Sequence, residues 1–276
     1  MKRLLDYHVH STHSGDGCAS IEDMCRLAVE RGIAEIAFSD HLDNNPDDDC
    51  YGLFDAARFC REVDECRERF GDRLTILKGA ELGEPHLYPR EIERIVGGER
   101  FDFLTGGIHW VGDAVVSVES PTGQTSRASQ TALYRDYFDE VLRAVECANF
   151  HVLAHLDLVK RFGVKYAGPF SVEPYREQIE AILRTMIERG IALEVNTSGC
   201  RQPCGEPFPG IETLRLYREF GGELITVGSD AHLAEHLGFG LAEGLRMIRE
   251  AGFDSITTYR NGTPSQKPIA SFLASP

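Results

Sequence analysis

The stretch Asp6-Tyr7-His8-Val9-His10-Ser11-Thr12-His13-Ser14-Gly15-Asp16-Gly17 closes the first apolar run of the chain. A strand alternates its side chains, so His8 and His10 are expected on one face. Two neutral imidazoles presented together can bind one divalent metal ion, and Asp16 in the glycine-bearing turn could add an oxygen ligand. Such a pair is also common as ordinary surface or core histidine. The pair alone therefore does not decide between a metal site and a structural role.

The composition limits the class of protein. With 276 residues, 42% of them hydrophobic and 26% charged, the chain can bury one large core, and we expect a single domain over residues 1–276. The formal net charge of −15 argues against nucleic-acid binding, which rests on Lys and Arg neutralising phosphates. The chain shows no apolar run long enough for a membrane span and no signal-peptide pattern, so we expect a cytoplasmic protein. The sequence leaves the oligomeric state open.

The eight cysteines are scattered along the chain, which favours reduced thiols over a disulfide framework. Cys200 and Cys204 form the closest pair in a loop. One Cys-x-x-x-Cys spacing without a second pair is weak support for zinc. We interpret these two cysteines as structural.

Short apolar runs alternate with amphipathic stretches of helical period, as in a parallel α/β sheet or barrel. Ser20 is expected to cap a helix that ends at Gly32. Asp55 is expected to cap a second helix, which extends to Phe70. Residues 111–127 are polar and form either a hairpin or a lid. A short terminal strand is possible near Ile256. Seven runs read as strands: the opening run to His10, then residues 35–40, 74–81, 101–109, 152–155, 191–196 and 224–232.

Polar residues gather where these runs end. In a (β/α) barrel the C-terminal tips of the strands meet at one end of the molecule, where active sites are built. Any one histidine there has an ordinary structural explanation, but the set predicts a site for several metal ions. The residues at the tips are His8, His10, Asp40, His41, Glu81, His109, His155, Glu194, Asn196, Asp230 and His232.

These motifs resemble those of the polymerase and histidinol phosphatase (PHP) superfamily of metal-dependent phosphoesterases. The matching segments, spread over nearly the whole chain, are His8-Val9-His10, Ser39-Asp40-His41, Glu81, Gly107-Ile108-His109, His155 and Gly228-Ser229-Asp230-Ala231-His232. The resemblance implies a distorted seven-stranded (β/α) barrel of TIM type. It also implies three divalent ions, zinc, manganese or iron, at the C-terminal ends of the strands.

The resemblance further implies how the ligands are shared. One ion would take His8, His10, Glu81 and Asp230, and a second would share Glu81 and add His109 and His155. The third would use Asp16, His41 and His232. Some members have histidine at the position of Asp16, and a harder oxygen ligand tilts this third site toward manganese or iron. Glu81 and Asp230 would therefore be essential for catalysis.

Substrate contacts are expected from two further segments. Arg161 follows His155 by six residues, and its planar guanidinium can hold a phosphate in a bidentate manner. The stretches His155 to Phe162 and Glu194 to Gly199 resemble the histidinol-phosphatase branch of the superfamily. Glu194 would meet a cationic amine or orient Arg161, with Asn196 beside it. His13 is a candidate substrate contact rather than a metal ligand.

The sequence thus predicts a metal-dependent phosphomonoesterase that hydrolyses L-histidinol phosphate in histidine biosynthesis. One alternative is a PHP phosphoesterase acting on nucleotides or other small phosphate esters. Another is a PHP module without catalytic activity that stabilises an assembly. The expected partner is a small phosphate ester, without nucleic acid or membrane.

Overall fold

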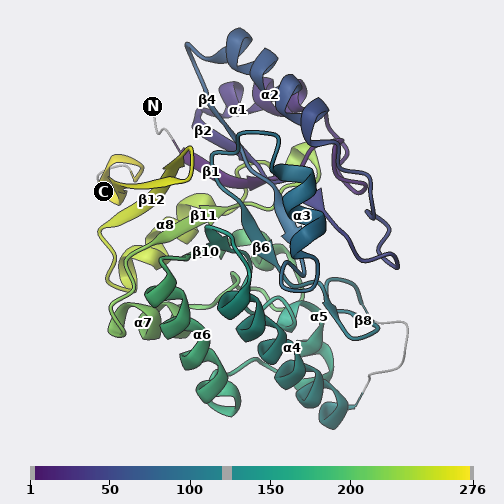
Figure 1. Ribbon diagram of the computed structural model, residues 1–276. Coiled ribbons are helices and arrows are strands. Elements are labelled where there is room, and N and C mark those ends of the chain that lie inside the picture. Colours follow the sequence, from purple (N-terminus) through teal and green to yellow (C-terminus); the bar gives the residue numbers. More distant parts are fainter. Residues whose placement is uncertain (1–3, 120–125, 274–276) are drawn as a thin grey trace.

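The computed structural model describes residues 4–119 and 126–273. Parallel strands form two sheets at the centre of an α/β fold, which confirms the predicted class (Figure 1). The first sheet has the order β1 (Leu4–Val9), β2 (Ile33–Phe38), β4 (Thr75–Lys78). The second has the order β11 (Ile225–Gly228), β10 (Ala192–Asn196), β9 (Val152–Leu153), β6 (Thr105–Gly107), β5 (Glu81–Gly83), β3 (His41–Leu42).

The chain breaks at the ends of two predicted strand runs. The run of residues 35–40 forms β2, which stops at Phe38, and β3 begins after it at His41. The run of residues 74–81 forms β4, and its last residue, Glu81, begins β5. Asp40 lies at the first break, and its carboxylate accepts hydrogen bonds from the backbone N–H groups of Ser11 (2.6 Å) and Ser14 (3.1 Å). Asp40 therefore binds the loop after β1 at the point where β2 has ended. The N–H of Glu81 still donates to the carbonyl of Asp40 at 3.0 Å, so the two broken strands stay side by side.

The two sheets also meet at the first strand. The backbone bridge Val9–Ala231 is parallel, and the N–H of Asp230 donates to the carbonyl of His8 at 2.8 Å. This places the end of β1 beside the end of β11. The first and last ligand-bearing segments of the sequence are therefore neighbours.

Eight α-helices of the described part of the chain surround the strands, as Figure 1 shows. Ser20 accepts a hydrogen bond from the backbone of Asp23 and caps the first helix, which ends at Gly32 in the left-handed region (φ 72°). Asp55 caps the second, and both predictions are confirmed. The helices are α1 (Ile21–Arg31), α2 (Ala56–Phe70), α3 (Pro89–Val96), α4 (Arg127–Cys147), α5 (Lys160–Ala167), α6 (Arg176–Arg189), α7 (Ile211–Glu219) and α8 (Leu241–Glu250).

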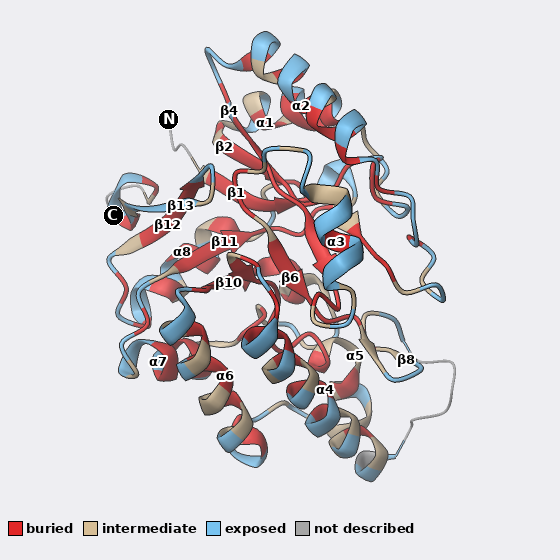
Figure 2. Cartoon of the chain, viewed as in Figure 1, coloured by how far each residue is buried: buried red, intermediate tan, exposed pale blue. Residues whose placement is uncertain are grey.

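The core lies between the strands and the inner faces of the helices. Figure 2 shows buried strands and helices exposed along their outer sides. The aromatic side chains Tyr134, Tyr137 and Phe138 of α4 are buried and belong to this core. The site at the strand ends therefore rests on a packed scaffold. No helix of the described residues is long and apolar enough to cross a membrane.

Two hairpins extend this scaffold. The strands β7 (Trp110–Val111) and β8 (Ala114–Val115) pair antiparallel, so the start of the polar segment 111–127 is a hairpin, while its residues 120–125 lie outside the described part. The strand predicted near Ile256 is β12 (Ser255–Arg260), which pairs antiparallel with β13 (Thr263–Pro268). Buried Glu35 of β2 anchors this second hairpin, because it accepts hydrogen bonds from Arg260 (2.9 Å) and Lys267 (2.8 Å).

Candidate metal centre

Glu81 is the centre of the polar cluster. The register of β3 against β5 places His41 directly beside it. Its carboxylate oxygens lie close to ring nitrogens of five histidines: His155 (2.7 Å), His8 (3.1 Å), His41 (3.4 Å), His109 (3.4 Å) and His10 (3.6 Å). A carboxylate with both oxygens among imidazoles is suited to bridge metal ions.

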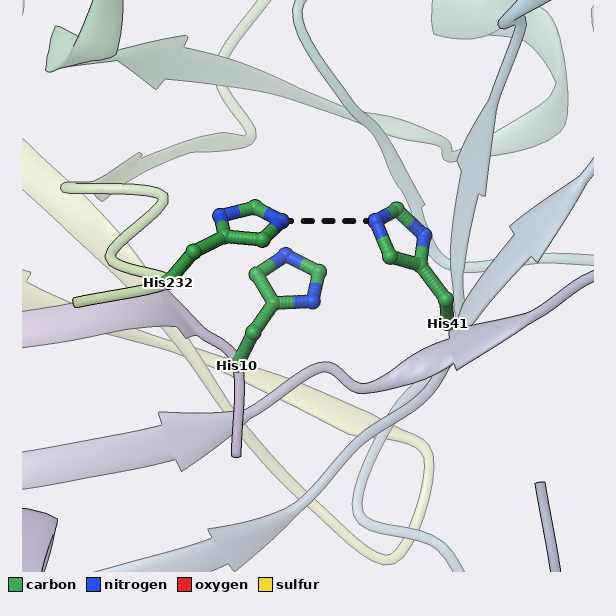
Figure 3. A group of neighbouring side chains, drawn as sticks. All are labelled: His10, His41 and His232. Atoms are coloured by element: carbon green, nitrogen blue, oxygen red, sulfur yellow. Dashed lines mark hydrogen bonds between the residues drawn. The ribbon is translucent and has the colours of Figure 1, made fainter. Parts of the chain in front are cut away.

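The imidazoles of His10, His41 and His232 point toward one another, as Figure 3 shows. The Nε2 atoms of His41 and His232 are 3.4 Å apart, and Asp16 Oδ2 lies 3.1 Å from His232 Nε2. His10 Nε2 is buried and makes no hydrogen bond within the described residues. Such a nitrogen is costly unless a ligand satisfies it. A divalent ion would do so, and the residues present therefore fit a metal.

Asp230 closes the cluster on the side of β11. Its Oδ1 lies 3.2 Å from His10 Nε2, while Oδ2 accepts hydrogen bonds from Asn196 (3.3 Å) and Ser198 (3.2 Å). Asp230 and His155 both have positive φ, 53° and 26°. Non-glycine residues adopt this region at a cost in free energy, and such strain tends to occur at functional sites.

The electrostatics favour the metal-binding form of Glu81, Asp230 and His10. Burial would raise the pKa of Glu81, but the surrounding imidazoles, His8 first, lower it well below the ordinary value. For Asp230, burial also acts upward, while His8 and His10 lower the pKa well below its usual range. Burial and neighbouring imidazoles lower the pKa of His10 well below its ordinary value. Two carboxylates and a neutral imidazole are the forms that bind metal.

Glu194 lies behind the cluster rather than in the cavity. It is 1% exposed, and its Oε1 is 2.7 Å from His8 Nδ1. Its Oε2 accepts hydrogen bonds from the backbone of His155 (3.0 Å) and the side chain of Asn196 (3.1 Å). Burial would lower the pKa of His8, but Glu194 and then Glu81 raise it well above the ordinary value. The placement favours a positioning role for Glu194 and Asn196 over the predicted contact with substrate.

His13 is directed away from the cluster. Its Nε2 lies 2.9 Å from Glu62 Oε2, and its ring packs edge-on against Phe59. It is absent from the residues that line the cavity described next. The geometry does not bring His13 to the place where a substrate would bind.

A cavity of about 450 Å³ opens over the cluster. Glu81, His109, His155, Asp230 and Arg161 contribute to its lining. The guanidinium of Arg161 donates to the carbonyl of Ser117 (2.9 Å), and its Nη2 lies 3.9 Å from Asp230 Oδ2. Arg161 thus presents a positive charge beside the candidate ligands, where the sequence predicts a phosphate contact.

The sequence reasoning missed several residues of this cavity. Asp43 and Asp48 line it together with Trp110. Glu84 lies nearby and accepts hydrogen bonds from the backbone of His109 (2.6 Å) and Trp110 (3.0 Å). Burial raises the pKa of Asp43 and of Glu84 to about 7 each. The sequence offered one clue to Asp43, which is its position two residues after the predicted ligand His41 and just beyond the end of β3.

The chain belongs to the PHP domain family, whose model matches residues 6–198. It is 28% identical to the histidinol-phosphatase of Lactococcus lactis over 93% of this chain and 94% of that protein. A protein of Thermotoga maritima named "Probable histidinol-phosphatase" is also 28% identical, over 91% of this chain and 94% of that one. The crystal structure of histidinol phosphate phosphatase (HISK) from Lactococcus lactis, complexed with zinc, L-histidinol and phosphate, matches with a TM-score of 0.82. The two are 25% identical, and the match covers 95% of this chain and 99% of that one.

Proposed function

We propose that the chain is a metal-dependent phosphatase that hydrolyses L-histidinol phosphate to L-histidinol and phosphate, as a step of histidine biosynthesis. The carrying observation is the ring of imidazoles around Glu81 in the same cavity as Arg161. The full-length likeness to a structure that holds zinc, L-histidinol and phosphate supports the choice of substrate. A cavity of about 450 Å³ suits a small molecule.

The proposal includes three divalent ions. One would be held by His8, His10, Glu81 and Asp230, a second by Glu81, His109 and His155, and a third by Asp16, His41 and His232. The short distances within each set support it. Zinc is the ion of the similar structure, while the oxygen of Asp16 favours manganese or iron at the third site. Such ions, when bound, supply an activated water and neutralise charge on a phosphate.

The remaining residues would bind the substrate phosphate and orient the metal ligands. Arg161 would bind phosphate oxygens through two parallel N–H groups, which fixes the ester in line with the ligand cluster. Glu81, at the start of β5, and Asp230, after the end of β11, would both supply carboxylate ligands to the cluster. Glu194 would hold the ring of His8 through Nδ1, so that Nε2 faces Glu81.

The proposal also includes the barrel predicted from the sequence. Counting β2 with β3 and β4 with β5 gives seven strands, and the bridge between Val9 and Ala231 joins the two sheets. This arrangement is compatible with the distorted seven-stranded barrel expected from the sequence, with the metal site at the C-terminal strand ends.

The test is a comparison of substrates on the metal-loaded protein. We expect the specificity constant kcat/KM for L-histidinol phosphate to exceed that for p-nitrophenyl phosphate and for a nucleoside monophosphate. A preference for the nucleotide would contradict the proposed substrate and favour a nucleotide-directed phosphoesterase. A lack of hydrolysis of every ester by a fully loaded sample would contradict the catalytic role.

A further inference from the structure

The cavity has a second group of acidic side chains, on the segment of residues 43–50 that follows β3, here called the acidic loop. Asp43, Asp47, Asp48 and Asp49 of this loop line the cavity. None of them belongs to the three proposed ligand sets. Asp43, Asp48 and Cys50 each offer one ligand atom, and these atoms lie within 4.8 Å of one another. The acidic loop therefore concentrates negative charge next to the proposed metal centre.

Asp43 is a buried carboxylate with an unsatisfied oxygen. It is 4% exposed, and its Oδ1 makes no hydrogen bond within residues 4–119 and 126–273. In the same part of the chain neither Asp43 nor Asp48 forms an ion pair with a lysine or arginine; the nearest ring nitrogen to Asp43 is His41 Nδ1, at 3.6 Å from Oδ2. A buried acceptor of this kind costs free energy until a donor reaches it. A cationic group entering the cavity would supply that donor.

Trp110 fixes the other carboxylate and adds an aromatic surface. Its indole Nε1 donates to Asp48 Oδ2 at 2.7 Å, and the backbone N–H of Cys50 donates to Asp48 Oδ1 at 2.7 Å. Trp110 lines the cavity beside the apolar side chains of Val115 and Leu158. An indole attracts cations over its face and stacks with other rings. One region of the cavity thus combines two acids with an indole side chain.

The chemistry of the group favours an organic cation over a further metal ion. Both oxygens of Asp48 already accept hydrogen bonds, from the indole of Trp110 and from the backbone of Cys50, which leaves fewer lone pairs for a metal ion than a free carboxylate offers. Together the two carboxylates still provide acceptors for an ammonium group.

We propose that Asp43 and Asp48, with the ring of Trp110, form the subsite that binds the ammonium group and imidazole ring of the substrate. The inference rests on the proposed function, because that function places the phosphate at the metal centre. In L-histidinol phosphate the amine is on the carbon next to the phosphorylated methylene. The amine therefore lies only a short way beyond the phosphate. This suits Asp43, whose Oδ1 lies 4.0 Å from His109 Nδ1, and Asp48, whose ligand atom lies within 4.8 Å of that of Asp43, so that both carboxylates share the ammonium group.

The test compares substrates that differ only in the amine. The metal-loaded protein and its Asp48→Asn variant are assayed with L-histidinol phosphate and with 3-(imidazol-4-yl)propyl phosphate, which lacks the amine. We expect Asp48→Asn to reduce the ratio of the two kcat/KM values by about tenfold or more, as for loss of a charge-assisted hydrogen bond. Affinity for the product L-histidinol, measured by calorimetry, should fall by a similar factor. Trp110→Phe should lower kcat/KM for both imidazole-bearing substrates, with a smaller change in the ratio of the two kcat/KM values.

The matched control is Asp113→Asn, which removes the same charge from an exposed turn outside the cavity and should leave both values unchanged. An unchanged substrate ratio in Asp48→Asn would overturn the proposal. So would the loss of one metal equivalent in that variant, since the subsite would then hold a metal. A wild-type protein that does not favour L-histidinol phosphate would refute the proposed function instead. In that case the pair 2-aminoethyl phosphate and ethyl phosphate still decides whether Asp48 recognises an amine.

Discussion

Glu194 Oε1 lies 2.7 Å from Nδ1 of His8, while Nε2 of the same ring lies 3.1 Å from Glu81 Oε2. The imidazole is thus held between two buried carboxylates, one behind the cluster and one at its centre. In metal sites such an outer carboxylate fixes the tautomer and the orientation of the ligating histidine.

Glu194→Gln should therefore weaken metal binding about 10- to 100-fold, the usual effect of losing such a partner. Hydrolysis of esters with and without an amine should fall in parallel, because the defect is in the metal centre. Metal titration followed by assays of both esters measures this. If hydrolysis of only the amine-bearing ester fell, Glu194 would instead contact the substrate, as the sequence predicts.

Glu81→Gln should abolish phosphatase activity and reduce the metal content of the purified protein. The amide keeps the size of the side chain but removes the charge that five imidazoles surround. Metal analysis and a phosphatase assay on the same sample provide the measurement. Full metal content with full turnover would show that Glu81 is not a shared ligand.

Removal of the metals should lower the thermal stability of the protein. Each ion that binds only the folded state, at about 100 times its dissociation constant, stabilises that state by about 2.7 kcal/mol. For a chain of this length each such ion corresponds to a shift in Tm of roughly 5 °C. Calorimetry of the chelated protein, before and after adding zinc or manganese, checks this; identical melting curves would exclude tight metal binding.

Arg161→Ala should lower kcat/KM for phosphate esters about ten- to a hundredfold while the metal content stays intact, because a charge-assisted contact to the phosphate is lost. Arg161→Lys is the matched control, since it keeps the charge but not the bidentate fork. It should recover only part of the loss. Wild-type kinetics in the alanine variant would show that Arg161 only braces the carbonyl of Ser117.

Stability should fall in acid partly because of Glu35. Burial would raise its pKa, but hydrogen bonds from Arg260, Lys267 and Tyr7 lower it below the ordinary value of 4.5. A lowered folded-state pKa contributes stability above the unfolded-state pKa, and this stability is lost as the pH falls through the folded-state pKa. Glu35→Gln should destabilise the protein by about 1–3 kcal/mol at pH 7. Denaturant unfolding at pH 7 and pH 3 should show a smaller difference between the two proteins in acid.

The strand runs and most of the polar cluster were predictable because their signals are local. Alternation places His8 and His10 on one face, and parallel strands bring their C-terminal ends together. The contacts of Asp40 at the break after β2 were not predictable, because they join it to a loop from another part of the chain. Asp43 was hidden among 44 acidic residues. The position of Glu194 depends on the stagger between neighbouring strands, which a single sequence does not reveal.

The junction of β1 with β11 has a consequence for synthesis of the protein. β1 pairs with β2 on one side, and on its other side Val9 bridges to Ala231 while Asp6 accepts hydrogen bonds from Ser229 and Gly238. A ribosome delivers the first proposed ligands, His8 and His10, long before Asp230 and His232. The growing chain must therefore hold an unfinished strand edge until its last fifth emerges. If the proposed ligand sets are correct, a nascent chain cannot complete its metal centre before Asp230 and His232 have been synthesised. Metal uptake would then coincide with the docking of the segment after β11 against β1.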